Sequence, residues 1–184
     1  MREDMSLSIT GTMSAIVTPF TKDGEIDFDA LEILVSGQID AGMDAIVPCG
    51  TTGETPALSA EEFAQVVRAV VRQVQGRIPV IAGTGSNSTK KTIETTRLAK
   101  ELGADAALVV VPYYNKPGPT MQVAHFQSVA NEGGLPVVLY NVPGRTGINM
   151  PAAVTIELAA HPNVIAVKEA SGDLSQVQRI LRET

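Results

Sequence analysis

The sequence predicts an α/β protein made of repeated βα units, and among such folds it favours the (β/α)8 barrel. Short apolar runs rich in valine, isoleucine and alanine recur about every thirty residues along the chain. Their apolarity is continuous rather than alternating, which is typical of parallel strands covered on both faces. Amphipathic helical patterns fill the intervals between the runs.

Six strands are predicted from these runs. Valine, isoleucine and alanine dominate them, and glycine, proline or asparagine bound most of them. The expected strands are 15–17, 45–49, 79–82, 106–111, 136–140 and 164–168.

The clearest predicted helix begins after Ser59, which can form a capping box with Glu62, and ends at Gly76. One face of it carries Phe63, Val66, Val67, Val70, Val71 and Val74. The other helices are predicted from polar caps or first-turn prolines at their starts and glycines at their ends. The start signals are Asp27, Ser88, Pro151 and either Ser171 or Asp173, the stops are Gly103 and Gly133, and Val123, Phe126 and Val129 mark a further helix.

Strict βα alternation fits either a doubly wound open sheet or a barrel, and the placement of the unusual residues favours the barrel. Polar and glycine-rich segments follow all six strands, and loops from consecutive strands meet on one face of a barrel. A barrel of this kind usually has eight units and ~250 residues. We therefore expect residues 1–184 to form a single, incomplete barrel domain, the N-terminal two thirds of a longer enzyme, with an unpaired edge at the sixth strand.

Composition excludes several functional classes. The net charge is −6 and no basic cluster occurs, so no nucleic-acid partner is expected. No apolar stretch is long enough to cross a membrane, which predicts a cytoplasmic protein with no membrane partner. Cys49 lies in an apolar segment and is interpreted as a small buried residue, while His125 and His161 are expected at the surface. The spacing of cysteines, histidines and carboxylates suggests no metal site.

Lys168 is the first candidate for chemistry. It ends the apolar run Val164–Val167, where an unpaired ammonium group is costly to bury. Desolvation would lower its pKa and free the amine to attack a carbonyl group, as in Schiff-base enzymes. Alternatively, its chain carries the ammonium group from the strand end into water.

Three further segments could serve such a lysine. The loop Gly50–Glu54 offers backbone amides and the Thr51 and Thr52 hydroxyls to a carboxylate, although it could also be an ordinary glycine-rich turn. Tyr140 ends the fifth predicted strand and the pair Tyr113–Tyr114 lies just past the fourth, and phenols can move protons to and from a carbinolamine. Arg145 lies in a short loop where its guanidinium group could bind a carboxylate. Gly83-Thr84-Gly85 is interpreted as a turn only.

Four of these segments together resemble one family. They are Gly50–Glu54, Pro112–Asn115, Tyr140–Gly147 and Val167–Ala170, in the order and spacing of the 4-hydroxy-tetrahydrodipicolinate (dihydrodipicolinate) synthases. The resemblance runs from about Gly11 to the last residue. It implies a lyase of the class I aldolase type, in the N-acetylneuraminate lyase superfamily, which condenses pyruvate with L-aspartate 4-semialdehyde in the diaminopimelate route to lysine.

The resemblance also implies a role for each catalytic candidate. Lys168 matches the lysine that forms a covalent imine with pyruvate, so no cofactor is needed. Tyr140 matches the tyrosine that moves protons at the imine, with Thr51 and Tyr114 completing the relay, the latter reaching in from a neighbouring subunit. Family members are commonly homotetramers built as dimers of dimers.

For the substrates, Thr52 matches the position that binds the pyruvate carboxylate, and Arg145 the one that receives the carboxylate of the aldehyde. Lysine-sensitive members have polar or acidic residues at the positions of Ala60, Phe63 and Lys91, so weak or absent lysine inhibition is expected here. Two alternatives stay open. They are another pyruvate-dependent aldolase, acting on sialic acid or keto-deoxy sugar acids, and a catalytically silent fragment whose role is subunit association.

Overall fold

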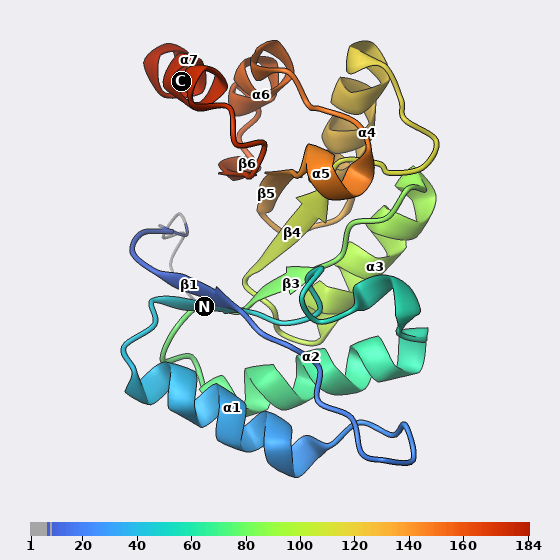
Figure 1. The fold of residues 1–184 in the computed structure, drawn as a ribbon, viewed down its shortest axis with the longest axis vertical. Helices are drawn as coiled ribbons and strands as arrows, with labels where there is room; N and C mark the ends of the chain where they lie inside the picture. Colours follow the sequence, from blue (N-terminus) through green and yellow to red (C-terminus); the bar gives the residue numbers. More distant parts are fainter. Residues whose placement is uncertain (1–6, 8) are drawn as a thin grey trace.

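The computed structural model describes residues 7 and 9–184, and within them the strands are parallel and lie in sequence order (Figure 1). β1 pairs with β2, and a second ladder runs β3-β4-β5-β6. A parallel bridge between Ile46 and Val80 connects the two ladders. The bounds are β1 Met13–Ala15, β2 Ala45–Val47, β3 Ile81–Gly83, β4 Ala106–Val110, β5 Val137–Asn141 and β6 Val164–Glu169. The predicted parallel α/β architecture is confirmed.

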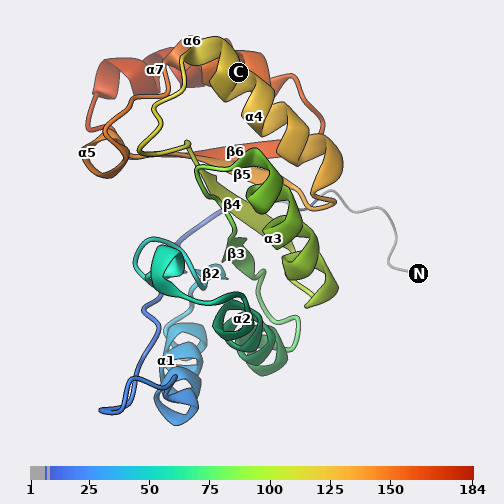
Figure 2. The ribbon, with the colours of Figure 1, turned by 90° about the vertical axis from the view of Figure 1, so that its right-hand side faces the viewer.

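The helices follow the strands and cover the outer face of the curved sheet (Figure 2). Their bounds are α1 Phe28–Asp40, α2 Ala60–Val74, α3 Thr89–Glu101, α4 Pro119–Glu132, α6 Ala152–Ala159 and α7 Leu174–Glu183. Two short elements, the 3-10 helix η1 Thr55–Ala57 and helix α5 Pro143–Thr146, occupy segments that the sequence predicted as loops. Both contain a proline at their start, which favours a first helical turn.

The predicted caps are present. Ser59 Oγ accepts a hydrogen bond from Glu62 N at 3.2 Å, and Glu62 Oε2 accepts one from Ser59 N at 2.7 Å, which completes the capping box of α2. For α7 the sequence left two caps open, and the structure selects Asp173, whose carboxylate accepts from Ser175 N and Gln176 N. The first strand lies two residues earlier than predicted, because the Asp44 amide already bonds to the Thr12 carbonyl.

Both faces of the central strands are buried, which explains their continuous apolarity. In β4, Ala107 and Val109 pack with the helices in the larger core cluster, whereas Ala106 and Leu108 lie on the inner face of the sheet. The inner cluster also contains Ala45, Val47, Ile81, Val138, Tyr140 and Val142. Side chains that follow these strands are thereby directed to the same end of the sheet.

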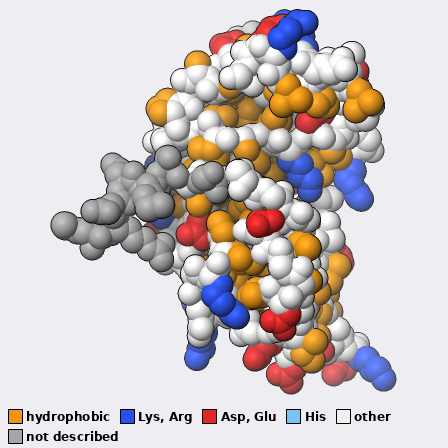
Figure 3. All heavy atoms as spheres, turned by 90° about the vertical axis from the view of Figure 1, so that its left-hand side faces the viewer, with side chains coloured by type: hydrophobic (Ala, Val, Ile, Leu, Met, Phe, Trp, Pro, Cys, Tyr) orange, Lys and Arg blue, Asp and Glu red, His pale blue; other side chains and the backbone are white. Residues whose placement is uncertain are grey.

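Within the described residues, β6 pairs only with β5 and β1 only with β2, so both are edge strands. Hydrophobic side chains are visible on the face of the molecule seen in Figure 3, which is the left side of Figure 1, where β1 and β6 are drawn. Leu174 and Leu181 of α7 are both 75% exposed. The expected unpaired edge at the sixth strand is thus present among the described residues.

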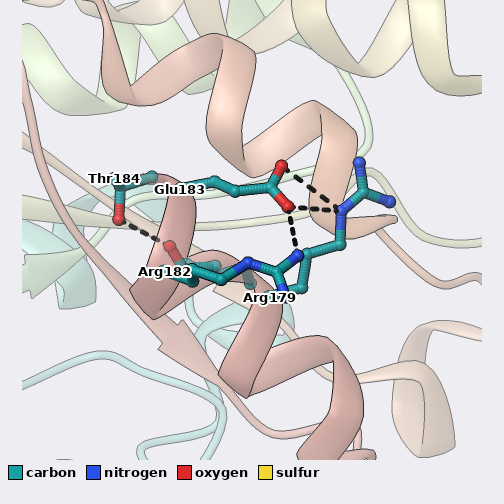
Figure 4. Close-up of polar contacts among 5 residues, drawn as sticks. Arg179, Arg182, Glu183 and Thr184 are labelled. Atoms are coloured by element: carbon teal, nitrogen blue, oxygen red, sulfur yellow. Dashed lines mark hydrogen bonds and ion pairs between the residues drawn. The ribbon is translucent and has the colours of Figure 1, made fainter.

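The end of α7 carries a small exposed cluster of charged side chains (Figure 4). Glu183 Oε1 lies 2.8 Å from Arg182 Nη2 and 3.4 Å from Arg179 Nε. Hydrogen bonding to Arg182 comes first among the contacts that hold the pKa of Glu183 below its usual value. Because the cluster is solvated, it contributes little to stability.

His125 lies in the core, contrary to the predicted surface position. It is only 4% exposed, because α4 is covered on two sides by α3 and α6. Its Nδ1 atom is 2.9 Å from Thr89 Oγ1, its Nε2 atom has no hydrogen-bond partner among the described residues, and burial lowers its pKa to about 4. His161 is partly exposed, with Nε2 2.9 Å from Asn131 Oδ1.

Candidate active site

A cavity of about 220 Å³ opens at the carboxyl ends of four consecutive strands, β2 to β5. Three of the predicted site residues line it: Thr51, Tyr140 and Arg145. The other lining residues are Cys49, Gly50, Thr55, Pro56, Gly83, Gly85, Leu108, Val110, Tyr113, Val142 and Thr146. The cavity is therefore lined mainly by apolar surface with a few polar groups, which is typical of a site for a small ligand.

Two glycines at the carboxyl end of β3, Gly83 and Gly85, allow the close backbone approach that forms one wall of the cavity. A Cβ atom on Gly83 would lie 2.0 Å from the Cys49 carbonyl oxygen, and one on Gly85 would lie 2.4 Å from Val110 N. Only glycine allows such close backbone approach. The sequence interpretation of this segment as a turn only was wrong for Gly83, which ends β3, and it missed the part of both glycines in shaping the cavity wall.

The loop after β2 is held by hydroxyl groups that the sequence analysis did not single out. The buried Thr18 donates from Oγ1 to the Gly53 carbonyl at 2.8 Å. Thr55 Oγ1 donates to the Gly50 carbonyl at 3.0 Å and also to the Cys49 carbonyl. These bonds fix the backbone on both sides of Thr51. The only sequence signal for these hydrogen bonds is a threonine next to a glycine-rich loop, because threonine hydroxyls often bond to nearby backbone groups.

Cys49 has a structural role, as predicted. It is 1% exposed, and burial raises the pKa of its thiol to about 12. Its backbone is unusual, with φ at +52°, a conformation that costs energy for a residue other than glycine. This left-handed turn directs the chain from β2 into the loop that carries Thr51.

Lys168 lies on β6 directly opposite Tyr140 on β5. Its Nζ atom is 4.7 Å from the centroid of the Tyr140 ring, in a cation–π contact. Tyr140 is buried at 6% exposure, whereas Lys168 is exposed. The desolvation that we expected for this amine is therefore not provided by residues 7 and 9–184, because β6 is an edge strand.

The other three predicted residues, Lys168, Thr52 and Tyr114, are not among those that line the cavity. Thr52 and Tyr114 are exposed and do not line the cavity. Tyr114 is 87% exposed with φ at +69°, while its neighbour Tyr113 does line the cavity. Within the described part of the chain, no hydrogen bond joins the Tyr140 phenol to Thr51 or Tyr114. The structure thus places Lys168 against Tyr140 and puts Tyr140 and Thr51 in the lining of one cavity, without a formed relay.

A second, smaller cavity of about 110 Å³ adjoins the first and shares Thr55, Pro56, Gly85 and Tyr113 with it. Ala60, Phe63 and Lys91 all line it. The three positions that the sequence analysis connected with lysine inhibition are therefore neighbours in space. No acidic side chain lines this cavity among the described residues, and Lys91 contributes a positive charge.

The described residues contain no group of three or more His, Cys, Asp and Glu side chains arranged to hold a metal ion. In the same part of the chain, none of the helices has the length and apolarity required for a membrane span.

Comparison with known proteins agrees with this geometry. A family model, "Dihydrodipicolinate synthetase family", matches residues 8–184. The 4-hydroxy-tetrahydrodipicolinate synthase of Syntrophotalea carbinolica is 53% identical over 174 residues, which cover 95% of this chain and 59% of that protein. The corresponding enzyme of Maridesulfovibrio salexigens is 48% identical over 178 residues, covering 96% of this chain and 61% of that protein.

Solved structures show the same fold. The dihydrodipicolinate synthase of Acinetobacter baumannii, solved in complex with pyruvate, superposes with a TM-score of 0.92 at 45% identity, covering 96% of this chain and 62% of that one. The Thermotoga maritima enzyme gives 0.92 at 41% identity, covering 95% and 59%. The chain thus spans about 60% of the length of these relatives and has six βα units of their (β/α)8 barrel. The chain belongs to the dihydrodipicolinate synthetase family.

Proposed function

We propose that the protein formed by this chain condenses pyruvate with L-aspartate 4-semialdehyde to 4-hydroxy-tetrahydrodipicolinate, through an imine on Lys168. The observation that carries the proposal is the position of Lys168 beside Tyr140, at the carboxyl ends of parallel strands where barrel enzymes bind their substrates. The family and its curated relatives supply the substrates.

The first step is attack by the lone pair of the Lys168 amine on C2 of pyruvate, which forms a carbinolamine. Loss of the hydroxyl group as water, after it gains a proton, leaves the imine. We assign the acid–base role to the Tyr140 phenol, because its ring lies against the Lys168 ammonium group. Tyr140 therefore donates and recovers the protons of this step.

The imine nitrogen then serves as the electron sink. A proton leaves the C3 methyl group, and the resulting enamine attacks the aldehyde carbon of the second substrate, whose oxygen takes up a proton. The amino group of that substrate next attacks C2, closes the ring and releases the Lys168 amine. No organic cofactor or metal ion is required by this sequence, because the lysine supplies the covalent chemistry.

The carboxylates of the two substrates are assigned to Thr52 and Arg145. Arg145 is placed by helix α5 at the rim of the cavity, where its guanidinium group is exposed and able to take a carboxylate in two hydrogen bonds. Thr52 follows Thr51 in the loop that Thr18 and Thr55 hold in place. Its assignment rests on the family resemblance.

Tyr114 completes the proton relay from a second subunit in this proposal. It is among the most exposed large side chains of the structure, at 87%, and it lies just outside the cavity. A tyrosine held in the left-handed region, with its ring in solvent, suits a contact across a subunit interface. The active form in this proposal is accordingly a homo-oligomer, arranged as a dimer of dimers. We place it in the cytoplasm, as a soluble protein.

The proposal is tested by trapping the imine. The protein is incubated with pyruvate and cyanoborohydride, and the adduct is located by intact mass and peptide mapping. We expect one pyruvate adduct on Lys168 and none in Lys168→Met. Because Lys168 is exposed, this substitution should change the free energy of unfolding by less than about 0.5 kcal/mol.

Lys90→Met is the matched control, because it removes an exposed lysine on α3 that does not line the cavity. The Lys90→Met variant should form the same single pyruvate adduct on Lys168 as the unchanged protein. A folded, soluble protein that gives no adduct would refute the proposal and support the catalytically silent fragment. Labelling of Lys168→Met at another lysine would refute the assignment of the nucleophile.

A further inference from the structure

Glu169, which directly follows Lys168 on β6, lies in a polar network on the opposite face of the strand. Successive side chains of a strand point to opposite faces. Lys168 therefore contacts Tyr140 at the inner face, and Glu169 points outward, where its carboxylate contacts β5 and α7.

The Glu169 carboxylate is bound at both oxygens. Asn141 Nδ2 lies 3.2 Å from Oε1 and 2.9 Å from Oε2, Gln176 Nε2 donates to Oε2 at 2.9 Å, and Ser171 N donates to Oε1 at 2.7 Å. Burial raises the pKa of Glu169, but the hydrogen bonds from Asn141, Ser171 and Gln176 together hold it below its usual value. The group is thus an ionised carboxylate surrounded by neutral donors.

The network continues into the segment before α6. Asn141 is fully buried, and its Oδ1 atom accepts from Met150 N at 2.9 Å. Asn149 Nδ2 donates to Gln176 Oε1 at 3.0 Å, and Gln176 Nε2 donates to the Met150 carbonyl at 3.2 Å. Three elements, β5, β6 and α7, therefore meet at the Glu169 carboxylate.

The register of the two strands connects this network to the candidate catalytic pair. Tyr140 is opposite Lys168, and Asn141 is opposite Glu169. The inner pair, Tyr140 and Lys168, and the outer pair, Asn141 and Glu169, are thus consecutive residue pairs of the same two strands. The register shifts between Val137 and Val138, earlier in the same strand pair. A slip of one residue would exchange the two faces, so a bond that fixes the outer pair also fixes the inner pair.

We propose that Glu169 is a positioning residue, whose carboxylate, held by Asn141 and Gln176, sets the place of the Lys168 amine relative to the Tyr140 phenol. This inference rests on the function proposed above. The positioning role of Glu169 is important because β6 is an edge strand within the described residues. No further strand packs against β6 there to hold Lys168 in place.

The test is Glu169→Gln, assayed by the time course of imine trapping with pyruvate and cyanoborohydride. Since both carboxylate oxygens accept hydrogen bonds, the amide NH₂ of a glutamine must face a donor in either orientation. Glu183→Gln is the matched control, because it makes the same charge change at the exposed cluster of α7 (Figure 4).

The rate and the amplitude of trapping separate positioning from folding. The amplitude reports the folded fraction, whereas the plateau rate at saturating pyruvate reports the geometry of the amine. We expect the plateau rate of Glu169→Gln to fall by about tenfold or more, with full amplitude and a half-saturating pyruvate concentration within about twofold of the unchanged protein. Glu183→Gln should react at the unchanged rate.

The other outcomes overturn the proposal. An unchanged rate in Glu169→Gln, a reduced amplitude alone, or an equal loss in Glu183→Gln would each exclude a positioning role. If Glu169→Gln does not fold, Gln176→Met decides, because it removes one of the donors: a rate about threefold lower supports the role, and an unchanged rate refutes it. Absence of any adduct in the unchanged protein would refute the proposed function itself, and this inference with it.

Discussion

Acid should destabilise this protein through one buried histidine, His125. The pKa of a free histidine is 6.5, and burial lowers that of His125 to about 4. The folded state therefore excludes a proton that the unfolded chain binds. Above pH 6.5 the His125 ring is neutral in both the folded and the unfolded state, so its burial does not reduce the free energy of unfolding. As the pH falls from 6.5 towards 4, only the unfolded state binds the proton, and the free energy of unfolding decreases.

The size of the loss follows from the shift. A change in pKa from 6.5 to about 4 corresponds to about 3 kcal/mol of unfolding free energy once the pH is below both values. The structure supports a large shift, because His125 is 4% exposed, its Nε2 atom has no hydrogen-bond partner among the described residues, and its other ring contact is the edge of Phe126.

The assay is urea unfolding followed by circular dichroism at several pH values between about 7 and 4.5, for the unchanged protein and His125→Gln. The glutamine keeps a hydrogen-bonding group near Thr89 and cannot be protonated. We expect the unchanged protein to lose about 2.5 kcal/mol more than the variant over this range. His161→Gln removes the other histidine as a control. The reasoning is refuted if the difference between the unchanged protein and His125→Gln stays constant within about 0.5 kcal/mol.

Two further predictions concern the cavities. Gly83→Ala should cost more than about 3 kcal/mol of unfolding free energy, because its Cβ atom would meet the Cys49 carbonyl, whereas Gly37→Ala in α1 meets nothing and should be neutral or stabilising. Equal urea midpoints for the two variants would contradict this. An enzyme containing this chain should show weak or no inhibition by L-lysine, because Lys91 repels a cation in the second cavity. A tenfold loss of rate at sub-millimolar lysine would show this prediction to be wrong.

The order and type of the main elements were predictable because both faces of the central strands are buried. Continuous apolar runs such as that of β4 and the capping box of α2 are local patterns with one structural outcome. The short elements η1 and α5 were not predicted, since a single turn has too few residues for a periodic signal. His125 was misplaced because its burial depends on α3, which is distant in sequence.

The candidate site likewise has features that the sequence predicted and features that it did not. The strand order places Tyr140 and Lys168 opposite each other on neighbouring strands, and the sequence predicted that they would meet. For the Lys168 side chain the sequence left two alternatives open, desolvation or extension into water, and the structure leaves it exposed, because burial of a strand end depends on what pairs with the strand. The parts played by Gly83 and Thr18 were missed, since each acts through a backbone group of a different βα unit.

By itself, then, the sequence determined the βα alternation, the end of the sheet where the candidate site lies and the identity of the candidate nucleophile. These follow from local periodicity and from motifs within single loops. The tertiary structure alone decided which groups share the cavity, how exposed Lys168 is and that Glu169 joins β5, β6 and α7. The physical reason is that burial and hydrogen-bond partners belong to pairs of residues brought together by the fold, and no local pattern records them.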